Sequence, residues 1–300
     1  METEKTLGTS EASPSPDDCE LTAPFGLGAL HERESYTPEE ALAALNAERP
    51  LFSMPLGIPL GDDPPVQWVM SDIHGCIDQY KWLLTSMNLR KCDRLYVLGD
   101  AIDRGPASMD VLCDVIFRPE ITYIPGNHDY FLLRLGPHFG FRPEEGRARA
   151  SLFDQMLYAA WMLDGGSSTL RQFRALPVDK RREILHYLEN APAVVETSVG
   201  SRKFILVHEA TRGFLERPRF SDWTLRDFMR RGFDYYEPIL PDERTVVSGH
   251  KWTAEIRRDG ASEIFSFANN IAVDCGCVQG GRLGAYCLDN TFRVYAPGYR

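Results

Sequence analysis

Acidic, histidine and amide side chains follow three successive strand-like runs of this 300-residue sequence. The three motifs are Asp72-Ile73-His74-Gly75, Gly99-Asp100-Ala101-Ile102-Asp103-Arg104-Gly105 and Gly126-Asn127-His128-Asp129. Because parallel strands of an α/β sheet deliver their carboxyl ends to one edge, we expect these side chains to meet there. Carboxylate, imidazole and amide donors without a thiolate suit divalent ions such as Mn²⁺, Fe²⁺ or Zn²⁺. The motifs therefore predict a metal site.

Two later strand-like runs also end in histidine, at His208 and His250. Taken singly, each of these residues is explained about as well as a polar side chain where a strand meets a turn as it is as a metal ligand. Five such strand ends at one sheet edge are not explained by coincidence. Two ions about 3.5 to 4 Å apart that share a carboxylate would hold a hydroxide between them and stabilise an in-line displacement at phosphorus. Hydrolysis of phosphoesters is therefore the expected chemistry.

The elements that must position these residues alternate between strands and helices. Strands at 66–70, 95–98 and 121–124 enclose helices at 79–87 and 107–117, a βαβαβ order that predicts an α/β fold with a mainly parallel sheet. Residues 128–190 have helical periodicity. Further strands are predicted at 194–197, 203–207, 245–247, 263–267, 271–273, 285–288 and 292–295. This order accommodates a four-layer α/β/β/α sandwich with two packed mixed sheets and a helical insert at about 130–190.

The negative charge of the chain lies in its first fifth. Residues 1–63 hold 13 Asp and Glu against 3 Lys and Arg, which accounts for the whole formal net charge of −10. Residues 1–20 are rich in Ser, Pro and acid and are expected to be disordered. Thr37 and Glu40 form a capping box for a predicted helix at about 38–48. We therefore divide the chain into an acidic N-terminal extension, 1–63, and a catalytic domain, 64–300.

This charge distribution also bears on partners and location. An acidic extension on a neutral body is repelled by nucleic acid and by anionic membranes, so neither is expected as a partner. The first twenty residues lack the apolar region of a signal peptide, and seven cysteines without a CxxC pair favour free thiols, so a cytoplasmic location is expected. A zinc site at Cys275, Cys277 and Cys287 is disfavoured because it lacks a fourth ligand.

The five ordered motifs resemble the calcineurin-like metallophosphoesterases. The closest subgroup is the phosphoprotein phosphatases with their bacterial and phage relatives, and the symmetric diadenosine tetraphosphatases are near neighbours. The resemblance covers about residues 66–296 and includes Asn270-Ile271-Ala272-Val273-Asp274-Cys275-Gly276 and Gly280-Gly281-Arg282-Leu283. It implies two bound divalent ions, with Mn²⁺ expected first and Fe or Zn as alternatives.

The same resemblance implies a role for each motif residue. The first ion would be held by Asp72, His74 and Asp100, and the second by Asp100, Asn127, His208 and His250. His128 would be the general acid, with Asp103 hydrogen-bonded to it so that the imidazolium is favoured and aimed. Arg104 and Asn127 would bind the substrate phosphate. Arg226, in Trp223-Thr224-Leu225-Arg226, is the nearest match to a second phosphate-binding arginine, although an exposed helical arginine explains it equally well.

Three positions depart from the pattern of the closest subgroup. Ser71 replaces a usual glycine, and Glu209 follows His208 where small residues are common; exposure to solvent is the default expectation for that carboxylate. Asp129 matches the tetraphosphatases, whereas Asp103 matches the protein phosphatases. The leading hypothesis is a phosphatase that acts on phosphoserine or phosphothreonine of a protein, or on small phosphomonoesters, and the alternative is a dinucleoside polyphosphate hydrolase. An inactive scaffold is disfavoured because no predicted ligand is lost.

The predicted insert is basic and could meet either the substrate or the extension. Its arginines include Arg142, Arg147, Arg149, Arg171 and Arg174. A solvated helix face is the more common explanation of such clusters, and recognition of an anionic substrate is the other. A further hypothesis is that the acidic extension folds back on this insert and restricts access to the site. Unchanged activity at low and high salt after deletion of residues 1–63 would contradict it.

Overall fold

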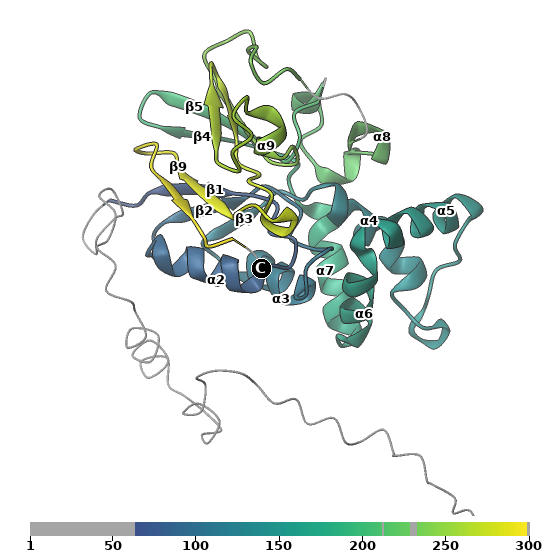
Figure 1. Ribbon diagram of the computed structural model, residues 1–300. Coiled ribbons are helices and arrows are strands. Elements are labelled where there is room, and N and C mark those ends of the chain that lie inside the picture. Colours follow the sequence, from purple (N-terminus) through teal and green to yellow (C-terminus); the bar gives the residue numbers. More distant parts are fainter. Residues whose placement is uncertain (1–63, 212, 229–232, 299–300) are drawn as a thin grey trace, which may run out of the picture. The chain divides into compact units, whose positions relative to one another are not determined.

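The computed structural model describes residues 64–211, 213–228 and 233–298 (Figure 1). The chain divides into two units, Met1–Met54 and Pro55–Arg300, and every described residue belongs to the second. The predicted disorder of residues 1–20, the predicted helix at 38–48 and the predicted boundary after residue 63 concern residues outside the described part. No helix in the described part is long and apolar enough to cross a membrane.

The first sheet contains the strands that precede the three motifs. Its order is β10 (Arg293–Tyr295), β9 (Gly284–Cys287), β1 (Gln67–Met70), β2 (Arg94–Val97) and β3 (Ile121–Tyr123). The strands β1, β2 and β3 are parallel, with Val69 opposite Tyr96 and Tyr96 opposite Thr122. The helices α2 (Ile77–Ser86) and α3 (Ser108–Phe117) make the crossovers that parallel strands require. The predicted βαβαβ order is therefore confirmed.

The second sheet is also mixed and has five strands. Its order is β4 (Val194–Val199), β5 (Arg202–Val207), β6 (Thr245–Ser248), β8 (Asn270–Ala272) and β7 (Phe265–Phe267). Here β5, β6 and β8 are parallel, whereas β4 and β7 are antiparallel edge strands. Most predicted strand ends lie within two residues of the observed ones.

An apolar layer fills the space between the two sheets. Val69 and Tyr96 of the first sheet meet Phe204, Leu206 and Val247 of the second. Since side chains alternate between the faces of a strand, the other face of the first sheet packs on α2 and α3, which lie below it in Figure 1.

The outer face of the second sheet is covered by short turns of helix. They include η3 (Phe214–Glu216), η4 (Phe220–Asp222) and α8 (Leu225–Phe228). Two further short helices of the chain are α9 (Thr253–Ile256) and η5 (Cys277–Gln279). The four-layer α/β/β/α arrangement is confirmed, with a fourth layer thinner than the first.

The predicted helical insert lies between β3 and β4. It contains α4 (Asn127–Phe139), η1 (Pro143–Glu145), α5 (Leu152–Trp161), a π turn η2 (Met162–Gly166), α6 (Ser167–Ala175) and α7 (Val178–Asn190). The helical run predicted over 128–190 is interrupted at Asp164 and Gly165, because Gly165 has a φ of +95°, which a continuing helix cannot accommodate. This interruption places a turn of the insert next to the loop that follows β2.

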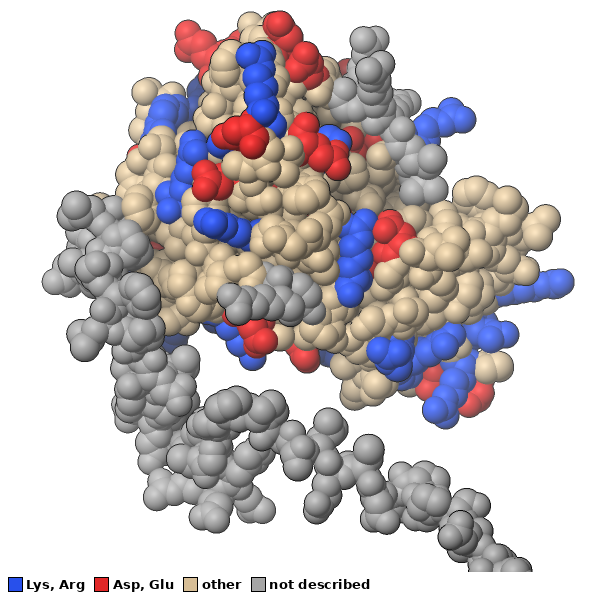
Figure 2. All heavy atoms as spheres, viewed as in Figure 1, with Lys and Arg blue, Asp and Glu red and all other residues tan. Residues whose placement is uncertain are grey.

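Five arginines singled out in the predicted insert face solvent. Arg142, Arg147, Arg149, Arg171 and Arg174 are all exposed. The Nε of Arg174 donates to the carbonyl oxygen of Phe139 within the insert, at 2.8 Å. Figure 2 shows basic side chains interleaved with acidic ones over the lower part of the insert. A solvated face is therefore favoured over substrate recognition.

Candidate active site

Loops that follow strands of both sheets place the motif side chains around one point. Asp72 and His74 follow β1, Asp100 follows β2, Asn127 begins α4 after β3, His208 follows β5, and His250 lies two residues beyond β6. The parallel strands β1 to β3 belong to one sheet, and β5 and β6 belong to the other. The expectation of a single sheet edge is therefore corrected: the carboxyl ends of two sheets meet at the site.

The backbone is left-handed at many of these positions. Asp72, His74, Asp100, Asp103, Arg104 and His250 have φ values between 48° and 71°. They are six of the nine described non-glycine residues with positive φ. A residue in this region costs about 1 kcal/mol or more, and such strain is usually retained where a side chain must be aimed. The strained turns therefore coincide with the motifs.

Glycines allow the loops to approach each other closely. A Cβ on Gly126 would collide with the Asp100 carboxylate and the His208 ring, and a Cβ on Gly249 would collide with the Ser71 hydroxyl. The same hydroxyl donates to the carbonyl oxygen of Leu98 at 2.6 Å. Ser71 therefore ties the β1 loop to the end of β2.

One group of potential ligand atoms surrounds Asn127. Its Oδ1 lies 2.8 Å from His250 Nδ1 and 3.0 Å from His208 Nε2. The two ring nitrogens are 3.2 Å apart, and Asp100 Oδ2 is 3.5 Å from His208 Nε2. Ligands that each lie about 2.1 Å from one ion are roughly 3 Å from one another. These four side chains could therefore hold one divalent ion.

Asp100 also faces a second group. Its Oδ2 lies 3.9 Å from His74 Nε2 and 4.0 Å from His128 Nε2. Asp72 Oδ2 accepts the backbone N–H of His250 at 3.0 Å and the hydroxyl of Ser71. By distance alone, the second group consists of His74, Asp100 and His128. The motif instead predicts that Asp72, with His74 and Asp100, binds the ion of this group. Neither candidate group in the described part of the chain contains a cysteine.

The contacts and burial of the histidines favour the neutral form that metal ligation requires. His74 Nδ1 lies 2.8 Å from the carbonyl oxygen of Ile102, and His208 Nδ1 lies 2.7 Å from that of Leu98. Donation from Nδ1 leaves the lone pair of each Nε2 directed into the site. Burial lowers the pKa of both imidazoles and lowers the pKa of His250 to about 4. Neutral imidazole is the form that binds a metal.

Buried carboxyl groups crowd the same space. Burial, followed by the charge of Asp274, raises the pKa of Asp72 well above its usual value. Burial, followed by the charge of Asp72, does the same to the pKa of Asp100, and burial raises the pKa of Asp274 to about 6. Divalent cations offset the cost of such a cluster. The donor types and the charge of the site thus fit a metal centre.

His128 and Asp103 form a fully buried pair beside Asp100. His128 Nδ1 lies 2.7 Å from Asp103 Oδ2, and neither side chain is exposed. The same carboxylate oxygen accepts the indole N–H of Trp161, also at 2.7 Å. His128 Nε2 has no hydrogen-bond partner among the described residues. An imidazole held through Nδ1 with Nε2 available can transfer a proton at Nε2.

The insert contributes a carboxylate that sequence reasoning missed. Asp164 Oδ1 accepts hydrogen bonds from Arg104 Nη2 at 2.8 Å and Nε at 3.3 Å, and its Oδ2 is 3.6 Å from His128 Nε2. Arg104 Nη1 also lies 3.0 Å from His74 Nε2. The Asp-Gly-Gly sequence at 164–166 is a turn signal within the helical run. It could have indicated a loop, but not the contact with Arg104.

The default expectation for Glu209 is wrong. The residue is only 5% exposed, and burial raises its pKa to about 8. Its Oε2 lies 3.5 Å from His250 Nε2. The next two residues, Ala210 and Thr211, are also buried. The carboxylate does not face solvent because the chain continues inside the protein after β5.

Asp129 holds loops in place. Its Oδ2 accepts the backbone N–H groups of Asp100 at 3.0 Å and Gly126 at 2.8 Å, and the hydroxyl of Tyr123 at 2.5 Å. Asp129 therefore fixes the loops that follow β2 and β3.

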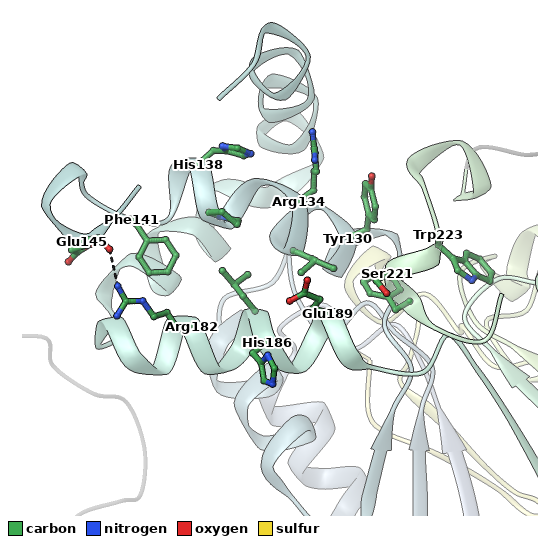
Figure 3. Close-up of a pocket in the computed structure, with 15 residues that line it drawn as sticks. Tyr130, Arg134, His138, Phe141, Glu145, Arg182, His186, Glu189, Ser221 and Trp223 are labelled. Carbon is green, nitrogen blue, oxygen red and sulfur yellow. Dashed lines mark hydrogen bonds between the residues drawn. The ribbon is translucent and has the colours of Figure 1, made fainter. Parts of the chain in front are cut away.

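No contact between Arg226 and the other predicted site residues is found among the described residues, although Phe228 of the same helix lies 6.4 Å from the ring of His208. Arg226 lies exposed on the short helix α8. Trp223, three residues earlier, lines a groove of about 600 Å³ together with Tyr130 of α4 and His186 of α7 (Figure 3). None of the motif residues lines this groove. The predicted phosphate contact of Arg226 therefore has no support from the described residues.

Known proteins share the motifs and the fold. The family model for calcineurin-like phosphoesterases matches residues 67–251, more than half of the chain. The symmetrical bis(5'-nucleosyl)-tetraphosphatases of Yersinia pestis (strain Pestoides F) and Yersinia pseudotuberculosis serotype O:1b (strain IP 31758) are each 43% identical over 68 residues, 22% of this chain. The match spans 24% of the length of these relatives.

A solved structure called "Crystal structure of a putative diadenosine tetraphosphatase" covers 80% of this chain and 97% of its own, with 19% identity and a TM-score of 0.53. At this identity the likeness concerns the fold. Because the family model matches more than half of its residues, the chain belongs to the calcineurin-like phosphoesterase family.

Proposed function

We propose that the chain is a dinuclear-metal phosphatase that hydrolyses phosphomonoesters, in particular phosphoserine and phosphothreonine of proteins. The observation that carries this function is the buried His128–Asp103 pair. Nε2 of His128 makes no hydrogen bond among the described residues and lies 4.0 Å from Oδ2 of Asp100, the carboxylate that both candidate ligand groups share. A proton donor so placed serves a leaving group that is a poor anion, as a serine or threonine alkoxide is.

Asp72, His74 and Asp100 would hold one ion, and Asp100, Asn127, His208 and His250 the other. When bound, the ions would activate water as the nucleophile and neutralise charge on the phosphoryl oxygens. Mn²⁺ is the first ion to test, with Fe²⁺ and Zn²⁺ as alternatives, because the same oxygen and nitrogen donors accept all three.

The other residues of the site act on the substrate. The guanidinium of Arg104 has a planar set of donors that suits phosphoryl oxygens, and Asn127 is the second phosphate contact that the motif implies. His128 gives its Nε2 proton to the departing oxygen while Asp103 holds the ring through Nδ1. The indole of Trp161 in turn fixes Asp103.

Hydrolysis of dinucleoside polyphosphates is the second candidate, and the 43% identity over 68 residues to symmetrical tetraphosphatases favours it. Its leaving group is a nucleotide phosphate, which departs readily as an anion and has less need of a proton donor. The His128–Asp103 pair therefore favours phosphomonoesters.

Product analysis separates the two candidates. Metal-stripped protein supplied with Mn²⁺ is incubated with a phosphoserine peptide and, separately, with diadenosine tetraphosphate. We expect metal-dependent release of phosphate from the peptide. Release of ADP alone would move the chain to the dinucleotide substrates, and no turnover of either by protein shown to bind metal would contradict both.

We predict that Asp164→Ala lowers kcat/KM about tenfold, because Arg104 loses the two charge-assisted hydrogen bonds that orient it. Asp164 is about half exposed, so solvent screening reduces the free energy that these charge-assisted hydrogen bonds contribute. Asp164→Asn retains an acceptor and should lose less. Hydrolysis of p-nitrophenyl phosphate at several substrate concentrations measures both variants, and wild-type kinetics in Asp164→Ala would remove this role.

A further inference from the structure

The three histidines of the site differ in what their outward ring nitrogen meets. For His74 and His208 that atom is Nδ1, and it lies 2.8 and 2.7 Å from a backbone carbonyl oxygen. His250 is turned the other way: its Nδ1 faces Asn127 and His208, and its Nε2 points outward. The nearest acidic oxygen to that outward nitrogen is Oε2 of Glu209, at 3.5 Å. Glu209 thus occupies, for His250, the place that carbonyl groups occupy for the other two rings.

Oε2 of Glu209 has no hydrogen-bond partner among the described residues. The Glu209 side chain is only 7% exposed. A buried carboxylate oxygen without a hydrogen bond lowers the stability of the fold. Such an oxygen beside a ring nitrogen that needs an acceptor therefore requires a functional explanation. A shift of about half an ångström would bring the two atoms within hydrogen-bond distance.

We propose that Glu209 is a positioning residue of the metal centre that accepts the Nε2–H of His250. This bond would fix the tautomer in which the Nδ1 lone pair faces the ion, and it would make the imidazole a stronger ligand. Removal of such an outer partner typically weakens metal affinity by about 10–100-fold. The role rests on the proposed metal function, since it acts only through an ion held by His250.

Direct metal binding tests this role without an activity assay. Free Mn²⁺ is titrated against the metal-stripped full chain and quantified by electron paramagnetic resonance, for wild type, Glu209→Ala, Glu209→Gln and the matched control Glu243→Ala. Glu243 is an exposed carboxylate just before β6. We expect Glu209→Ala to weaken one of two ions about 10–100-fold, Glu209→Gln to weaken it less because its amide oxygen can still accept, and the control to bind as wild type.

A double-mutant cycle with His250→Ala separates positioning from a general effect on folding. If Glu209 acts through the ring, Glu209→Ala should add little in the His250→Ala background. Equal affinity of wild type and both Glu209 variants would overturn the role of Glu209 alone. A wild-type chain that takes up no Mn²⁺, Fe²⁺ or Zn²⁺ would overturn the metal centre itself. Should Glu209→Ala not fold, Glu209→Met, which keeps the side-chain volume and removes the acceptor, decides the question by the same titration.

Discussion

Replacing His128 with asparagine is expected to lower kcat toward a phosphoserine peptide by about 10²–10⁴-fold, the usual contribution of a positioned general acid. The ring is fully buried, is held by Asp103 through Nδ1 and presents an unpartnered Nε2 to the site. Steady-state phosphate release measures the loss. The effect should be much smaller on p-nitrophenyl phosphate, whose leaving group is a stable anion that needs no proton.

Metal content distinguishes the two roles that the geometry allows for His128. Its Nε2 lies 4.0 Å from Asp100 Oδ2, close enough to belong to a metal group with His74. If it is the acid, His128→Asn keeps both ions and loses rate on poor leaving groups. A variant that binds one ion fewer, and loses the same factor on both substrates, would show instead that His128 is a ligand.

The second large effect concerns the shared carboxylate. We expect Asp100→Asn to lose most metal binding and nearly all activity, because both ligand groups include Asp100 and an amide carries no charge. Saturating Mn²⁺ at about 100 times its dissociation constant should stabilise the wild type by about 2.7 kcal/mol per ion. Thermal unfolding with Mn²⁺ and with a chelator measures this shift. A wild-type shift in Asp100→Asn would contradict the shared role.

The pH dependence of metal uptake follows from the same carboxyl groups. Burial, with the neighbouring carboxylates, raises the pKa of Asp72 and Asp100, so in the metal-free folded chain these groups keep protons above the usual range. Ions must displace those protons, and affinity should therefore fall as pH is lowered from 8 to 5.5. Since burial lowers the pKa of His250 to about 4, protonation of that ring adds little in this window. Mn²⁺ titrations at pH 5.5, 7 and 8 check the sign, and equal affinities would contradict it.

Much of the fold could be read from local patterns. The alternation of strand and helix from β1 to β3 and the motif after each strand depend on short-range periodicity, which the sequence displays directly. The helical insert was also predictable, but its break at Gly165 was less so, since an isolated glycine pair inside a helical pattern signals a turn without saying what the turn contacts.

What the sequence by itself determined is the order of the candidate donors Asp72, His74, Asp100, Asn127, His208 and His250 after their strands, and hence the metallophosphoesterase family. Only the tertiary structure decided which side chains support these donors. Asp164 reaches Arg104 across 60 residues, Glu209 is buried beside His250, and Arg226 stays exposed on α8. The physical reason is that burial and long-range contacts depend on how two sheets and an insert pack, whereas a carboxylate in a sequence looks the same whether it faces water or a metal centre.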